Sequence, residues 1–174
     1  ELGSIVPQTT AADDGKVCLL RGSVSPVLAR RGVEQPASLV CVDMKTGKEL
    51  WHKTAGDRGS ISTTFSPTLL IHKGIVYTAS GGKLTARDVS TGAEIWSGPC
   101  SKESYKSPVN IYIVDDLIWD LNVSGNSGGR TWTAYDPRSG KEVKQLPTGE
   151  EHGYAVMHHR CHIPRASGKN IITS

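Results

Sequence analysis

The strongest constraint on the fold of this chain is a segment that occurs three times, in copies that align with one another without gaps. The copies span residues 39–51, 84–96 and 132–144, and each places Asp, Thr or Ser, and Gly at the same spacing. The repeated Asp residues are 45 and then 48 residues apart. A period of about 40–50 residues with strand-like contents is typical of β-propeller blades, each built from four short antiparallel strands.

Each copy of the repeat predicts a β-hairpin. Alternating residues such as Leu84 and Ala86 predict a strand with one face turned inward. The Asp carboxylate can accept hydrogen bonds from backbone amides ahead of it, and the Gly four residues later can adopt the positive φ that closes the turn. The structural positions of the repeat are Asp43, Gly47, Trp51, Ala86, Asp88, Gly92, Trp96, Ala134, Asp136 and Gly140.

Two further strands are predicted upstream of the second and third hairpins. Residues 66–71 and 75–80 flank a turn at His72-Lys73-Gly74, and residues 107–114 and 117–121 flank Asp115-Asp116. In the terminal units we expect strands at 17–21 and 39–42, and then at 154–160 and 170–173 with a turn at 164–169. The predicted blades are 15–52 (partial), 64–97, 106–146 and 153–174 (partial).

The predicted fold class is therefore all-β: one propeller segment over residues 1–174, with about two full and two partial four-stranded antiparallel blades. Closed propellers have about four to eight blades. We therefore expect a fragment of a longer propeller, and the alternative is a small ring closed by joining the end strands.

Composition fits this fold and excludes several classes of partner. Gly and Pro together supply 28 of 174 residues, which favours many turns. The net charge of +3 and the lack of aromatic residues among the basic ones argue against nucleic-acid binding. No membrane span is expected because the longest apolar runs have four residues, and the first four residues do not resemble a secretory signal.

The cysteines and histidines supply the candidate metal ligands. The four Cys residues form no Cys-x-x-Cys motif, and two disulfides or four buried thiols are both open. In an extended segment 152–162, His159 and Cys161 would share a face at a spacing of about 7 Å, which could hold one metal ion from two sides. Zinc needs further ligands, for which the candidates are His72 or residues outside this chain. The alternative is a strand that lines the central channel, with Cys161 in a disulfide or as a buried thiol.

Several acidic and amide residues lie near the predicted strand ends, where they could serve as ligands. We interpret them as turn and solvent-face residues: Asp115, Asp116, Asp120, Asn110 and Asn122. No catalytic residue is recognised.

The pattern Ala-x-Asp-x-x-Thr-Gly-x-x-x-Trp at 86–96 resembles the tryptophan-docking motif of pyrroloquinoline-quinone-like (PQQ-like) β-propellers. The resemblance covers about residues 15–174. The first copy has Cys41 at the Ala position, and the third has Lys144 at the Trp position. In the family this Trp packs on the Gly of a neighbouring blade, so the resemblance implies that Trp51 and Trp96 lock blades together.

The resemblance implies two classes of function, because the family includes quinoprotein alcohol and sugar dehydrogenases as well as an outer-membrane assembly lipoprotein. The dehydrogenases often carry a vicinal Cys-Cys pair, which is absent here. We expect a binding or scaffold module of a larger exported bacterial protein, periplasmic or secreted. Its expected partners are the remaining blades and a protein or small ligand in the channel. The alternative is part of a PQQ- and calcium-dependent dehydrogenase, and whether the chain is an enzyme stays open.

Overall fold

A computed structural model supplies the structure of the chain. It describes residues 5–22, 37–54, 68–80, 82–101, 111–123, 130–147, 165–167 and 169–172. The His-rich segment 152–162 and the strand predicted at 154–160 lie outside these residues.

The described residues form three four-stranded antiparallel sheets, here called blades 1, 2 and 3. Blade 1 comprises β1 (Ile5–Asp13), β2 (Lys16–Gly22), β3 (Ala37–Asp43) and β4 (Glu49–Thr54). Blade 2 comprises β5 (Thr68–His72), β6 (Ile75–Ser80), β7 (Lys83–Asp88) and β8 (Glu94–Pro99). Blade 3 comprises β9 (Ile111–Val114), β10 (Leu117–Val123), β11 (Arg130–Tyr135) and β12 (Glu142–Pro147).

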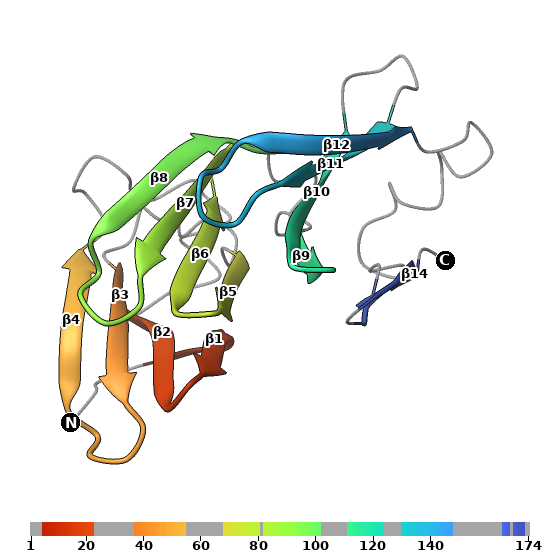
Figure 1. The fold of residues 1–174 in the computed structure, drawn as a ribbon. Helices are drawn as coiled ribbons and strands as arrows, with labels where there is room; N and C mark the ends of the chain where they lie inside the picture. Colours follow the sequence, from red (N-terminus) through yellow and green to blue (C-terminus); the bar gives the residue numbers. More distant parts are fainter. Residues whose placement is uncertain are drawn as a thin grey trace.

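Strand order follows chain order in every blade, as a propeller requires. The three blades lie along an arc, with β4, β8 and β12 on its convex side and β1, β5 and β9 on its concave side (Figure 1). A last antiparallel pair, β13 (Arg165–Ala166) and β14 (Ile171–Ile172), follows blade 3 in the chain. The predicted all-β class and four-stranded antiparallel blades are confirmed.

Blade 1 is more complete than the sequence predicted. The partial blade expected from residue 15 lacked its first strand, whereas β1 pairs with β2 and makes the sheet four-stranded. The segment was missed because Thr and Ala dominate its second half and give no apolar alternation, and because the pairing shifts register between Ile5 and Thr10. Near the C-terminus, the turn predicted at 164–169 is also wrong in part, since β13 occupies residues 165–166.

The repeated hairpin closes in the same way in all three blades. In blade 1, Oδ1 of Asp43 accepts hydrogen bonds from the backbone N and the Oγ1 of Thr46, each at 2.7 Å. The N–H of Gly47, at φ +69°, donates to the backbone oxygen of Asp43 at 2.8 Å. Asp88 and Asp136 make the corresponding bonds in blades 2 and 3. These bonds lower the pKa of each Asp, chiefly through the Thr or Ser hydroxyl.

The hydrophobic core lies between the blades. Cys18, Cys41 and Trp51 of blade 1 form one buried cluster with Leu69 and Val76 of blade 2. A second cluster joins blade 2 to blade 3 and contains the buried residues Ile75, Tyr77, Ala79, Leu84, Ala86, Ile111 and Ile118. Blades 1 and 2 therefore each bury an apolar face against the next blade, which is how packed sheets are stabilised.

Candidate functional site

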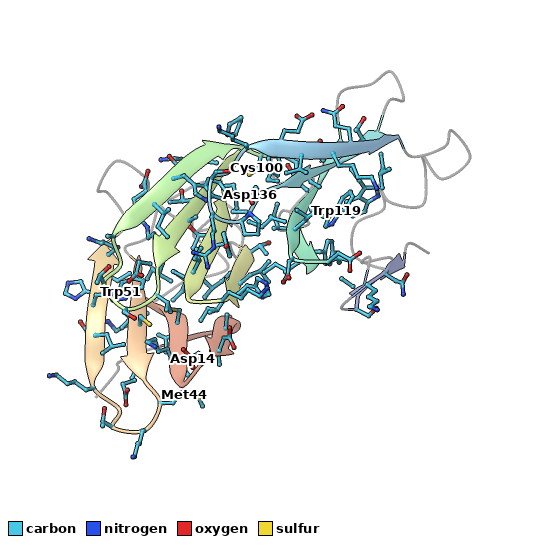
Figure 2. All side chains as sticks on the ribbon, in the orientation of Figure 1. Asp14, Met44, Trp51, Cys100, Trp119 and Asp136 are labelled. Atoms are coloured by element: carbon cyan, nitrogen blue, oxygen red, sulfur yellow. The ribbon has the colours of Figure 1, made fainter. Side chains whose placement is uncertain are left out.

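Trp51 joins blade 1 to blade 2. Its Nε1 donates a hydrogen bond of 2.8 Å to the backbone oxygen of Val89, in the turn after β7. Its ring lies on Gly92 so closely that a Cβ atom built there would be 2.7 Å from Cδ2 of Trp51. Trp51 is labelled in Figure 2, at the boundary between β4 and that turn. The ring therefore needs a residue without a side chain opposite it.

Trp96 joins blade 2 to blade 3 with the same geometry. Its Nε1 donates to the backbone oxygen of Pro137 at 2.8 Å, and its ring lies on Gly140. The hydroxyl of Tyr77 donates to the same carbonyl at 3.1 Å, and the rings of Tyr77 and Trp96 lie 6.2 Å apart. Both available lone pairs of one carbonyl are thus used to hold the blade 3 turn against blade 2.

The outer strand of blade 3 lacks this aromatic residue. Lys144 occupies the position of Trp51 and Trp96, and the described part of β12 is exposed along its length. Val143 and the equivalent residues Leu50 and Ile95 are all exposed large apolar side chains. The sequence did not predict this exposure, although aligning the three repeats shows an apolar residue at the same position in each.

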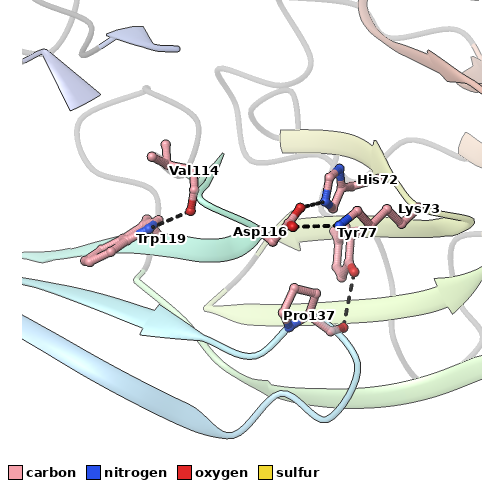
Figure 3. A network of polar contacts seen from close by, with 7 residues as sticks. All are labelled: His72, Lys73, Tyr77, Val114, Asp116, Trp119 and Pro137. Atoms are coloured by element: carbon pink, nitrogen blue, oxygen red, sulfur yellow. Dashed lines mark hydrogen bonds and ion pairs between the residues drawn. The ribbon is translucent and has the colours of Figure 1, made fainter. Parts of the chain in front are cut away.

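A charged cluster joins the first turns of blades 2 and 3. One oxygen of Asp116 lies 2.9 Å from Nε2 of His72, and the other lies 2.6 Å from Nζ of Lys73 (Figure 3). The hydrogen bond from Lys73, followed by that from His72, lowers the pKa of Asp116. Asp116 has φ +58°, whereas blades 1 and 2 place Gly15 and Gly74 at this turn position. An L-residue in this conformation is strained, and the bridge between blades supplies a compensating interaction.

Asp120 is the buried acidic residue of blade 3. It is 1% exposed and accepts hydrogen bonds from both the backbone N–H and the side-chain hydroxyl of Ser101, which lies two residues after Pro99, the last residue of β8. Burial raises the pKa of Asp120, and the two bonds from Ser101 partly oppose that rise. The expectation that Asp120 is a turn or solvent-face residue is therefore wrong, because it lies on the same face of β10 as Ile118, which packs against blade 2. Its role here is to tie the segment leaving blade 2 to blade 3.

The predicted metal-binding pair lies outside the described residues. His159, Cys161 and Asn110 lie outside them, and His72 contacts Asp116. Asp115 and Asp116 lie in the β9–β10 turn, as expected. Within the described ranges, no three His, Cys, Asp or Glu side chains are placed to hold a metal ion. In the same ranges, no helix is long and apolar enough to cross a membrane.

Comparison with known proteins supports the propeller architecture. The family described as outer membrane protein assembly factor BamB matches residues 33–162. A polyvinylalcohol dehydrogenase from Pseudomonas sp is 26% identical over 138 residues, which cover 69% of this chain and 20% of that protein.

Solved structures give the same result for the fold. BamB from Moraxella catarrhalis superposes with a TM-score of 0.55 at 16% identity, covering 95% of this chain and 42% of that one. The β-propeller domain of the Trilobed protease from Pyrococcus furiosus has a TM-score of 0.54 at 8% identity, covering 94% and 46%. The chain thus spans less than half the length of each of these proteins.

Proposed function

The chain belongs to the PQQ-like β-propeller family that includes the outer membrane protein assembly factor BamB. We propose that it is a protein-binding scaffold module. It would act within a larger exported bacterial protein, periplasmic or secreted, with the remaining blades of that protein as its first partners. A partner protein would bind the convex rim.

The row of exposed apolar side chains on the rim is the observation that supports this proposal. Leu50, Ile95 and Val143 occupy the same position on β4, β8 and β12, and they are 38%, 46% and 56% exposed. One exposed apolar side chain is ordinary. Here the same position is exposed on three successive outer strands, and Figure 1 shows these strands on the convex side of the arc. Exposed apolar groups rimmed by polar ones are typical of protein-binding surfaces.

The buried and turn polar groups support a structural role for the rest of each blade. The three repeat Asp residues hold their own hairpins, Asp120 holds Ser101, and Asp116 joins two turns. These carboxylates are engaged in bonds that shape the fold. The rim therefore offers the better candidate for contact with another molecule.

A site-specific photo-crosslinking experiment in cells tests the proposal. A photoreactive residue placed at Ile95 in the full-length protein should give a discrete protein adduct, and one at the exposed turn residue Ser90 of the same blade should not. Val143→Glu and Leu50→Glu should weaken the adduct while leaving the folded protein intact. Folded protein that gives no adduct from a photoreactive residue placed in turn at Leu50, Ile95 and Val143 would contradict the proposal.

The alternative is that the chain forms part of a quinoprotein alcohol or sugar dehydrogenase, and the similarity to a polyvinylalcohol dehydrogenase favours it. Such an enzyme would need PQQ and calcium. The described residues do not fit that requirement, since they bring no three acidic or His side chains together, and the sequence has no vicinal Cys pair. No reaction step is therefore derived from them.

A further inference from the structure

Blade 1 differs from its neighbours at one cross-strand position in its core. Cys18 on β2 lies directly opposite Cys41 on β3. The same position holds Tyr77 opposite Ala86 in blade 2, and Trp119 opposite Ala134 in blade 3. Both members of an aromatic–alanine pair are thus replaced by Cys in blade 1. A change at one member alone would leave an ordinary buried thiol, whereas the joint change places two thiols face to face.

The strand register brings these two thiols within bonding range. Met44 donates from its N–H to the backbone oxygen of Gly15 at 2.8 Å. Gly15 and Met44 therefore form a hydrogen-bonded pair, and Cys18 and Cys41 are the third pair further along the same two strands. Because hydrogen-bonded and non-hydrogen-bonded pairs alternate along antiparallel strands, the Cys pair is of the non-hydrogen-bonded type, in which the Cα atoms are about 4.5 Å apart. A disulfide spans Cα separations of about 4.4–6.8 Å. The two thiols also hydrogen bond to each other in the reduced structure.

The surroundings protect these thiols after folding. Both residues are 0% exposed and belong to the cluster beneath Trp51. Burial raises the pKa of each thiol, so little thiolate is present in the folded blade. Thiolate is the species that attacks a disulfide. Oxidation is therefore expected while the blade is open, during folding, and to be slow once it has closed.

We propose that Cys18 and Cys41 are a modification site, at which an intrablade disulfide forms by exchange with an external disulfide during folding in an oxidising compartment. One Cys thiolate attacks the external disulfide, forms a mixed disulfide and releases one external thiol. The second Cys thiolate then displaces the other external thiol and closes the Cys18–Cys41 bond. The two cysteines lose two protons and two electrons in total, and the external disulfide is reduced to two thiols.

The bond would strengthen the first interface between blades. It closes the chain across residues 18–41 and lies under the side chain that docks on blade 2. Cross-linking raises stability by restricting the unfolded chain. The inference is independent of whether the rim binds a partner protein, because it concerns only blade 1.

Refolding in a mixture of reduced and oxidised glutathione tests the site. In a Cys100→Ser/Cys161→Ser variant of the full chain, both remaining thiols should become inaccessible to alkylation under denaturing conditions, and a peptide map should join residues 18 and 41. The melting temperature should rise by about 5–10 °C over the reduced form and fall back when reductant is added. The same protein, folded in the reduced state first, should react far more slowly.

The matched control is Cys41→Ala in that background, because Ala86 and Ala134 occupy this position in the other blades. It should fold, keep Cys18 open to alkylation after denaturation and show no redox-dependent melting shift. Complete alkylation of both cysteines in the refolded parent variant would overturn the proposal. If that variant does not fold, the peptide map is made on the unaltered chain, where a bond from either residue to Cys100 or Cys161 would overturn the proposal equally.

Discussion

The contact between Trp51 and Gly92 gives the sharpest prediction of how the blades are held together. Gly92 has φ +70°, and a Cβ atom there would lie 2.7 and 2.8 Å from two ring carbons of Trp51. Gly47 has nearly the same backbone angle, φ +69°, but a Cβ atom there meets nothing within 4 Å. The two glycines therefore separate backbone strain from loss of the docking contact.

The expected costs follow from this difference. Gly47→Ala should lower the free energy of unfolding by about 1–2 kcal/mol, the cost of a left-handed L-residue. Gly92→Ala carries the same strain and also displaces a buried indole, which adds about 1–3 kcal/mol of overpacking. Urea denaturation of both variants, with equal m-values, measures the difference. The stable hydrogen bond from Trp51 to Val89 limits how far the ring can move.

A double-mutant cycle isolates the docking contact itself. In a Trp51→Ala background the ring is absent, so Gly92→Ala should cost no more than Gly47→Ala does. The resulting coupling energy should be about 1–3 kcal/mol. Equal costs for Gly47→Ala and Gly92→Ala in the natural background would refute the reasoning, because the ring would then exert no constraint on residue 92.

Three further substitutions test the other contacts between blades. Burial puts the folded pKa of Asp120 above its unfolded value. This group therefore makes the free energy of unfolding fall as pH rises from about 4 through the folded pKa. Asp120→Asn should remove that decline in urea titrations run from pH 4 to 7, and an unchanged slope of unfolding free energy against pH would contradict the prediction. Tyr77→Phe removes the hydrogen bond to Pro137 and should cost about 1 kcal/mol of unfolding free energy, whereas a neutral result would show that the bond adds nothing. Asp116→Gly relieves the backbone strain of a positive φ but removes the ion pair that joins the two turns. The melting temperature of this variant should therefore depend less on salt concentration than that of the natural chain. Identical salt dependence would show that the ion pair contributes nothing measurable.

The hairpins could be predicted from sequence because their determinants are local. An Asp, a Thr or Ser, and a Gly within five residues make three bonds that recur in all three turns. The strand predicted at 75–80 coincides with β6. The first strand could not be predicted in the same way. It is held by pairing with β2, and its own Thr and Ala residues carry no apolar alternation.

Other contacts between blades, apart from those of Trp51 and Trp96, depend on residues far apart in the chain and could not be predicted from sequence. Asp120 is buried on the face of β10 that packs against blade 2, where Ser101 hydrogen bonds to it, and no local pattern indicates this. Leu50 and its equivalents, apolar by type, are exposed because the outer strand turns that side outward. The pairing of His159 with Cys161 on one metal ion stays a prediction.

Dye reduction by the full-length protein, with PQQ, calcium and polyvinyl alcohol or a simple alcohol present, tests the central claim most directly. A scaffold propeller should give no calcium-dependent dye reduction above a control without PQQ, while photo-crosslinks from Ile95 persist. Turnover that requires both PQQ and calcium and that is retained when the rim is substituted would contradict the scaffold account. It would identify the chain as part of a quinoprotein dehydrogenase.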